Sequence, residues 1–249
     1  MRPWNYIEID ECNESLLSIP LSFYRITPHP YLSLGAPYGQ STDPWRLRVD
    51  VIRRLTVAQE LLLEANHKVK LALFDAWRPI AVQQFMVDYV IQKQCQLKGI
   101  NPLDVDYELH RRSIAEEVSN FWALPSLNPS TPPPHSTGAA VDLTLVDDTE
   151  TLVDMGGEID AIGPISSPDY YNHLNSSNPS SISTLYHSRR QLLSDVMERA
   201  GFAQHPHEWW HFSFGDQMWA WKRDYPRAIY GAFADFSKPI IKSSPNCLT

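Results

Sequence analysis

The chain has 249 residues, of which 43% are hydrophobic, and it carries a formal net charge of −8. This hydrophobic content is sufficient for a buried core, so the composition excludes a disordered chain. The negative charge and the lack of a long lysine or arginine run argue against nucleic acid or an anionic membrane as partner. A small molecule is the favoured partner.

The N-terminal sequence and the cysteines bear on cellular location. Residues 1–14 contain acidic side chains where a secretory signal needs an apolar core, and no run of roughly eighteen apolar residues occurs. The cysteines at 12, 95 and 247 are far apart and lack CxxC spacing, which indicates neither a disulfide framework nor a cysteine zinc site. We therefore expect a cytoplasmic protein with reduced thiols and no membrane partner.

We expect a single domain covering residues 1–249, because the sequence contains no internal repeat and no linker between two cores. Repeated prolines in residues 1–45 predict an irregular N-terminal segment that wraps the core. The periodicity of apolar residues predicts helices over residues 51–65, 80–97, 106–121 and 188–200. Short apolar or alternating runs predict strands over residues 69–76, 140–145 and 210–214.

Strands flanked by several helices, without regular alternation, predict an α+β fold. We expect a small antiparallel sheet that helices cover on one face, with the functional site on the open face. Residues 169–186, rich in Asn and Ser, are long enough to form a lid or a surface excursion, and the sequence leaves both open.

Two of the predicted strands each carry a polar side chain on the face opposite their apolar residues. Side chains two residues apart share a face of a strand, so Asp142 points away from its apolar neighbours Val141 and Leu143. The same rule separates His211 from Trp210 and the phenylalanines that follow. We therefore expect Asp142 and His211 on an open, polar face.

The stretch HEWWH, from His207 to His211, supports two incompatible structures. A helical HExxH would place His207 and His211 on one helical face as zinc ligands, with Glu208 as the base. The alternation after Trp209 and the turn that follows favour a short strand instead, which leaves little room for such a helix. His207 is then a bystander.

The second structure draws its other ligands from HSTGAAVD upstream. His135, Asp142 and His211 would bind one Zn²⁺ per chain and leave a fourth position open, as in catalytic zinc sites. Gly138 allows the chain between the first two ligands to turn back sharply. Glu208, close to the metal and not bound to it, could act as general base and then as general acid.

These residues resemble the D-alanyl-D-alanine dipeptidases of the zinc M15 peptidase group. The family signature SxHxxGxAxD followed by ExxH is matched by His135, Gly138, Ala140 and Asp142, and then by Glu208 and His211. The segments 75–79 (DAWRP), 142–145 (DLTL) and the helix that ends in AGF at 200–202 also match, so that coverage runs from about Leu71 to Phe214.

The resemblance implies a fold, an activity and two further site residues. The fold would be that of the hedgehog and DD-peptidase zinc enzymes, and the reaction would be hydrolysis of the D-alanyl-D-alanine dipeptide to two D-alanine molecules. Arg78 would stabilise the developing oxyanion, and Asp160 would hold the free amino end of the dipeptide. Without the resemblance, the plainer expectation is that Arg78 pairs with Asp75 and that Asp160 is solvated.

The chain departs from the family pattern at two points. Pro133 replaces the serine two residues before the first histidine, which weakens the case for strict dipeptide preference. Tyr24 and Tyr31 are both candidates for the N-terminal aromatic residue that contacts substrate in the family. A D,D-carboxypeptidase acting on longer peptidoglycan stem peptides and a non-catalytic zinc-binding module of the same fold remain as alternatives.

Overall fold

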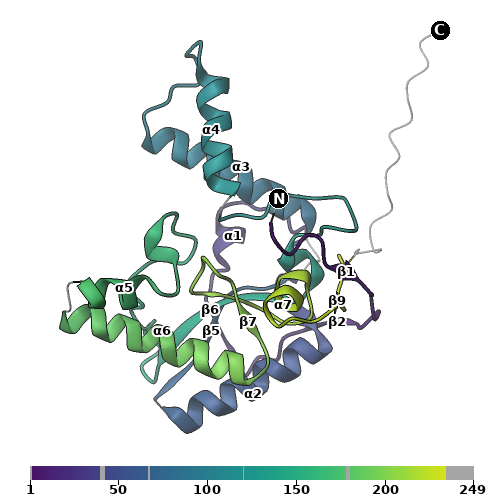
Figure 1. Ribbon diagram of the computed structural model, residues 1–249, viewed down its shortest axis with the longest axis vertical. Helices are drawn as coiled ribbons and strands as arrows, with labels where there is room; N and C mark the ends of the chain where they lie inside the picture. Colours follow the sequence, from purple (N-terminus) through teal and green to yellow (C-terminus); the bar gives the residue numbers. More distant parts are fainter. Residues whose placement is uncertain (1, 40–42, 67, 120, 178–179, 234–249) are drawn as a thin grey trace.

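The computed structural model describes residues 2–39, 43–66, 68–119, 121–177 and 180–233. A five-stranded sheet with the strand order β3-β5-β6-β8-β7 lies at its centre (Figure 1). The strands are β3 (Tyr24–Arg25), β5 (Val69–Asp75), β6 (Ala140–Asp147), β8 (His211–Ser213) and β7 (Ala203–Gln204). The fold is mixed α/β, and the three predicted strands are present.

We expected an antiparallel sheet, and the observed sheet is mixed. The pairings β5-β6, β6-β8 and β7-β8 are antiparallel, whereas β3 runs parallel to β5 with Tyr24 opposite Ala72. Strand β3 comes from the N-terminal segment that was predicted to be irregular. This segment is rich in proline, and β3 has only two residues. It nevertheless forms one edge of the sheet.

Two smaller strand pairs also include this N-terminal segment. Strand β1 (Glu8–Ile9) runs parallel to β9 (Arg227–Ala228), and β2 (Leu16–Ser18) runs antiparallel to β4 (Arg46–Arg48). A one-turn helix, α1 (Pro30–Ser33), begins at a proline in the first helical position. The segment that we predicted to be irregular therefore contains these short elements of secondary structure.

All four predicted helices are present. They are α2 (Val49–Ala65), α3 (Ile80–Leu97), α4 (Tyr107–Ser119) and α6 (Ser181–Arg199). Helix α6 begins earlier than expected because Ser180 caps it, its side chain accepting from the Ser183 backbone N–H. The Asn- and Ser-rich segment is thus helical, comprising α5 (Tyr170–Ser177) and the start of α6. The remaining helices are α7 (Gln217–Lys222) and the 3₁₀ turns η1 (Pro134–Thr137) and η2 (Pro164–Ser166).

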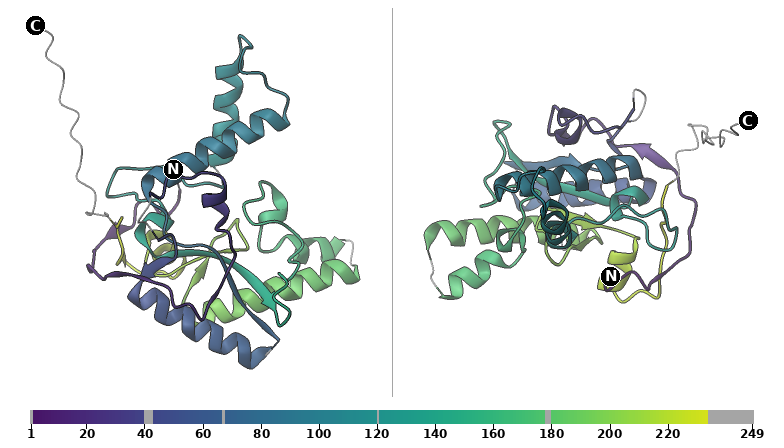
Figure 2. Two further views of the ribbon diagram at one scale, coloured as in Figure 1. Left: turned by 180° about the vertical axis from the view of Figure 1, so that it is seen from behind. Right: turned by 90° about the horizontal axis from the view of Figure 1, so that it is seen from above.

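Helices α2 and α6 pack against one face of the sheet. Helices α3 and α4 pair with each other and project away from the sheet (Figure 1; Figure 2). Apolar residues of the strands and of α2 and α6 share one buried cluster that includes Leu55, Leu62, Val141, Leu143, Leu193 and Phe212. A second cluster, around α1, α3 and α4, includes Tyr31, Val82, Met86, Ile114 and Trp122.

The alternation of side chains along β6 agrees with the prediction, and the expectation of an open face was wrong. Val141 and Leu143 point into the first cluster, and Asp142 points the other way. Asp142 is nevertheless only 2% exposed. Its face is closed because Arg78, Tyr31 and Trp122 lie over it in mutual contact.

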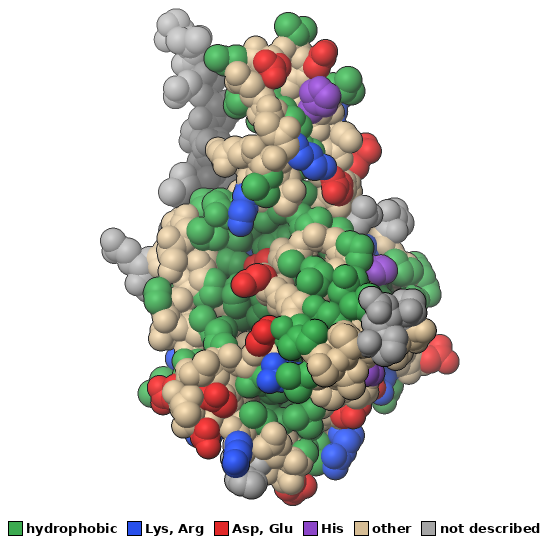
Figure 3. Space-filling view, turned by 90° about the vertical axis from the view of Figure 1, so that its left-hand side faces the viewer, with side chains coloured by type: hydrophobic (Ala, Val, Ile, Leu, Met, Phe, Trp, Pro, Cys, Tyr) green, Lys and Arg blue, Asp and Glu red, His purple; other side chains and the backbone are tan. Residues whose placement is uncertain are grey.

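Within the described residues, none of the helices has both the length and the apolar character needed to cross a membrane. Cys12 and Cys95 are free thiols, and Cys247 lies outside the described residues. On the face shown in Figure 3, lysine and arginine side chains are scattered among hydrophobic and acidic ones and form no single basic patch.

Candidate metal centre and active site

Sheet register brings two of the predicted ligands together. Asp142 on β6 lies directly opposite His211 on β8, so both side chains emerge on the same face. His135 comes from η1, which ends at Gly138 in the left-handed conformation with φ 74°. That turn directs the chain from His135 straight into β6, so the two residues reach one point despite their sequence separation.

The donor atoms of these three residues form a compact triangle. His135 Nε2 lies 3.1 Å from Asp142 Oδ2 and 3.2 Å from His211 Nδ1, and His211 Nδ1 lies 3.0 Å from Asp142 Oδ1. Tetrahedral zinc with bonds of about 2.0–2.1 Å places its ligand atoms roughly 3.3 Å apart. Two imidazole nitrogens and a carboxylate are also the donor types that zinc prefers. The residues present therefore fit a zinc ion.

Hydrogen bonding leaves the ligand atom of His135 available. Its Nδ1 lies 2.7 Å from the Ala76 carbonyl oxygen, which can only accept, so Nδ1 carries the proton and Nε2 presents a lone pair to the triangle. Burial raises the pKa of Asp142, but the rings of His135 and His211 outweigh it and hold that pKa well below its usual range. Asp142 is therefore an anionic donor.

Glu208 lies beside the triangle and is not a member of it. Its Oε2 is 3.6 Å from His211 Nδ1, and its side chain is buried. Burial, reinforced by the charge of Asp142, raises the pKa of Glu208 to about 8, while Arg2 acts in the opposite direction. A carboxyl group with such a pKa can both accept and return a proton near neutral pH.

The HEWWH stretch is not helical. Residues 206–210 form turns, and β8 begins at His211. His207 is exposed, so the helical zinc site with His207 as a ligand is absent from the structure. His205, just before this stretch, is buried and was not among the predicted site residues. Its ring packs edge-on against the ring of His211, with centroids 5.3 Å apart. Its backbone N–H donates to the His211 carbonyl, a pairing that no local motif signals.

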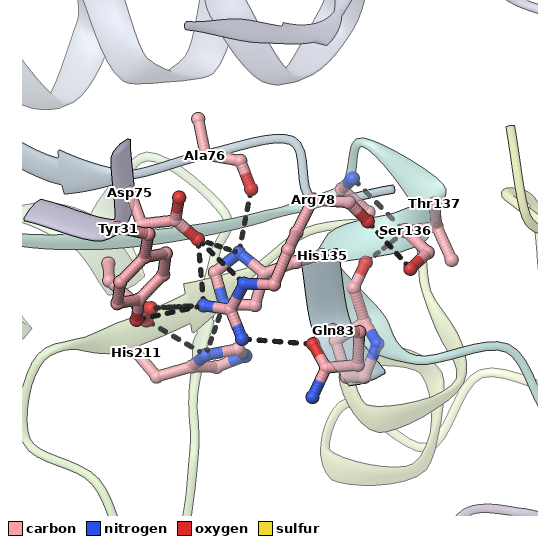
Figure 4. Close-up of polar contacts among 12 residues, drawn as sticks. Tyr31, Asp75, Ala76, Arg78, Gln83, His135, Ser136, Thr137 and His211 are labelled. Carbon is pink, nitrogen blue, oxygen red and sulfur yellow. Dashed lines mark hydrogen bonds and ion pairs between the residues drawn. The ribbon is translucent and has the colours of Figure 1, made fainter. Parts of the chain in front are cut away.

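Arg78 is held rigidly next to the triangle (Figure 4). Its Nε and Nη2 donate to the buried Asp75 carboxylate at 3.0 and 2.7 Å, and Nη1 donates to Gln83 at 2.9 Å. Nη2 also lies 3.4 Å from Asp142 Oδ2. Burial lowers the pKa of Arg78, but Tyr31, Asp75 and Asp142 together raise it well above its usual value. The predicted pairing with Asp75 is present, and it aims the guanidinium at the site.

Asp160 also lines the site, and it is partly buried rather than fully solvated. Its backbone has φ 66°, and its Oδ2 accepts a hydrogen bond from the Tyr31 hydroxyl at 2.9 Å. Burial, reinforced by Asp142, raises the pKa of Asp160 to about 8. Of the two candidate aromatics, Tyr31 contacts both Asp160 and Arg78, whereas Tyr24 belongs to the sheet edge strand β3. Tyr31 also accepts a hydrogen bond from Arg78 Nη2 at 3.1 Å.

The segment that carries Asp160 is anchored from behind. The buried guanidinium of Arg190 on α6 donates to the carbonyls of Met155, Ile165 and Ser167 on either side of it. The Trp209 backbone N–H, next to Glu208, donates to the Ser166 carbonyl at 2.9 Å. These bonds fix Asp160 relative to the strand that carries His211.

A cavity of about 30 Å³ lies at the triangle of His135, Asp142 and His211. Asp142, Asp160, Glu208, Arg78 and Arg2 all contribute to its wall. A groove of about 590 Å³ adjoins it and shares Arg2, Ala123 and His205 with it. The site is thus small, rich in acidic groups and open on one side to a larger groove.

The sequence comparisons decide the family. The family model described as D-ala-D-ala dipeptidase, peptidase M15, matches residues 32–232. The D-alanyl-D-alanine dipeptidase of Synechocystis sp. is 44% identical over 225 residues, which cover 89% of this chain and 90% of the relative. The chain belongs to the D-alanyl-D-alanine dipeptidase family. The family member from Enterococcus faecium is 37% identical over 184 residues, covering 72% of this chain and 80% of that protein.

Solved structures are more distant than these dipeptidases. A VanYB structure in complex with D-alanine-D-alanine aligns with a TM-score of 0.38 and 17% identity, covering 71% of this chain and 76% of the other. The LD-carboxypeptidase LdcB aligns with a TM-score of 0.41 and 15% identity, covering 91% and 78%. The assignment to the dipeptidase family, and with it the peptidase class of the enzyme, rests on sequence.

Proposed function

We propose that this protein is a zinc-dependent D-alanyl-D-alanine dipeptidase, which hydrolyses the dipeptide to two D-alanine molecules. The main observation in support of this proposal is the triangle of His135, Asp142 and His211 with Glu208 beside it, in a member of the dipeptidase family. We also propose that residues 1–249 form one domain with the hedgehog and DD-peptidase type of zinc fold.

The three residues of the triangle would hold one zinc ion per chain. When bound, zinc acts as a Lewis acid towards water and towards the scissile carbonyl. Glu208 takes a proton from the attacking water as the oxygen–carbon bond forms, and it then donates this proton to the amide nitrogen as the carbon–nitrogen bond breaks. Its elevated pKa of about 8 suits both halves of this exchange.

Arg78 stabilises the negative charge that develops on the carbonyl oxygen. Asp75 and Gln83 fix the guanidinium before substrate arrives, so little reorganisation is needed during the reaction. The group stays charged throughout because its pKa is raised further above its usual value.

Asp160 and Tyr31 support a dipeptide over a longer stem peptide. A free dipeptide carries an ammonium group next to its only peptide bond, and the Asp160 carboxylate is the acceptor that would pair with it. In a stem peptide this nitrogen is acylated and uncharged, so the ion pair with Asp160 could not form. The non-catalytic alternative gives no role to Glu208 and Arg78.

The test is zinc content together with turnover of D-alanyl-D-alanine. Glu208→Ala should retain zinc and lose roughly 10²- to 10⁴-fold in kcat, because it removes the proton acceptor and spares the ligands. Glu158→Ala, at an exposed glutamate, is the matched control and should behave as wild type. Full activity in Glu208→Ala, or a wild-type protein that binds zinc without hydrolysing the dipeptide, would overturn the proposal.

A further inference from the structure

Arg2, near the N-terminus, is one of the residues that line the candidate active site. It lines both the small cavity and the adjoining groove. Two residues further on, the ring of Trp4 packs against Trp221 of α7 with centroids 5.5 Å apart, which anchors the segment that carries Arg2. Arg2 Nη2 donates to the Phe121 carbonyl at 3.1 Å, which ties the N-terminal segment across the cavity.

The two arginines of the cavity differ in how their charge is neutralised. Arg78 is paired with Asp75 and Asp142. Arg2 forms no ion pair with any residue that the structure describes, and it contacts a carbonyl oxygen and, at 5.4 Å, the face of the Trp4 ring. Burial lowers the pKa of Arg2, and the Glu208 carboxyl partly offsets this. Arg2 is thus a partly buried cation that lacks an anionic partner.

The proposed substrate carries the missing anion. At neutral pH, D-alanyl-D-alanine is a zwitterion with an ammonium group at one end and a carboxylate at the other. Asp160 accounts for the ammonium group, and Arg78 faces the centre of the site. An arginine presents a planar fork of donors that matches a carboxylate, so a second arginine at the cavity mouth suits the remaining end of the dipeptide.

We propose that Arg2 binds the C-terminal carboxylate of the substrate and restricts the enzyme to peptides with a free carboxyl end. This inference rests on the proposed dipeptidase function. It also gives the N-terminal segment a role in specificity, because a residue added after the second D-alanine would have to occupy the space at Arg2, between cavity and groove.

The experiment pairs a change in the enzyme with a change in the substrate. The zinc-loaded wild type, Arg2→Gln and Arg2→Lys are assayed on D-alanyl-D-alanine and on its C-terminal amide, D-alanyl-D-alaninamide. Wild type should prefer the free acid. Arg2→Gln should lose roughly 10- to 100-fold in kcat/KM on the free acid, as expected for a lost charge-assisted hydrogen bond, and should change by less than about twofold on the amide. Arg2→Lys should be intermediate.

Arg227→Gln is the matched control, since its side chain is 57% exposed and the change removes the same charge at a residue that lines neither the cavity nor the groove. It should keep the wild-type preference. Equal losses on both substrates in Arg2→Gln would overturn the inference and indicate an effect through Glu208, and unchanged kinetics would overturn it as well. A wild type that hydrolyses neither substrate refutes the proposed function itself, so the two failures are distinguishable.

Discussion

Replacement of Asp160 by asparagine isolates the charge that we assign to the substrate ammonium. Asparagine has nearly the same shape, tolerates the positive φ of 66° and can accept the Tyr31 hydrogen bond through its carbonyl oxygen. The fold and the metal site should therefore be unchanged. What Asp160→Asn removes is the carboxylate that pairs with the free amino end.

The size of the effect follows from the environment of Asp160. Truncating one partner of a buried charge pair costs about 2–5 kcal/mol. With a pKa of about 8, Asp160 must give up a proton to pair at pH 7, which costs about 1.4 kcal/mol for the one-unit difference. The net loss is therefore about 0.6–3.6 kcal/mol, or roughly 3- to 400-fold in kcat/KM on D-alanyl-D-alanine at pH 7.

The assay compares D-alanyl-D-alanine with N-acetyl-D-alanyl-D-alanine, which has no ammonium group. Asp160→Asn should lose activity on the free dipeptide only, and Asp148→Asn, at an exposed aspartate, should lose none. For wild type, the Asp160 carboxylate forms as pH rises, so kcat/KM on the dipeptide should rise with pH and then fall as the α-amino group, with a pKa of about 8, loses its charge. Equal losses on both substrates would refute the assignment of Asp160.

Further predictions concern the metal site. His135→Ala should lose zinc and activity, whereas His207→Ala should keep both, because His135 belongs to the triangle and His207 is exposed. Metal analysis and turnover measurements check this. Loss of zinc in His207→Ala would contradict the proposed metal site. Gly138→Ala should lower the free energy of unfolding by about 1–3 kcal/mol, because φ 74° is costly for alanine and its Cβ would collide with Leu16. Denaturation with wild-type stability would contradict this.

The side on which each residue of the triangle emerges could be predicted from sequence, because local patterns determine it. Alternation along β6 and β8 placed Asp142 and His211 on the face opposite the apolar residues, and Gly138 signalled the turn after His135. Sheet register, which sequence does not state, then set the two strands so that Asp142 and His211 are directly opposite each other.

The rest of the site could not be predicted because it is assembled from distant segments. Arg2 and Tyr31 belong to a segment whose prolines predicted only irregular chain. Their positions depend on tertiary packing, of Trp4 against Trp221 and of Tyr31 against Trp122. The closed face over Asp142 has the same origin. Periodicity reports which side of a strand is polar, and it does not report what later covers that side.

The closure of this face links metal binding to substrate binding. The charge of Asp142 is one of the causes that raise the pKa of Asp160. A cation held by Asp142 would offset that charge, so Asp160 would ionise at lower pH and pair more readily with an ammonium group. By reciprocity, a bound ammonium group stabilises the Asp160 carboxylate, which in turn favours the cation. The acidic limb of the pH profile in the zinc-loaded enzyme should therefore lie at or below the value of about 8 that applies without metal.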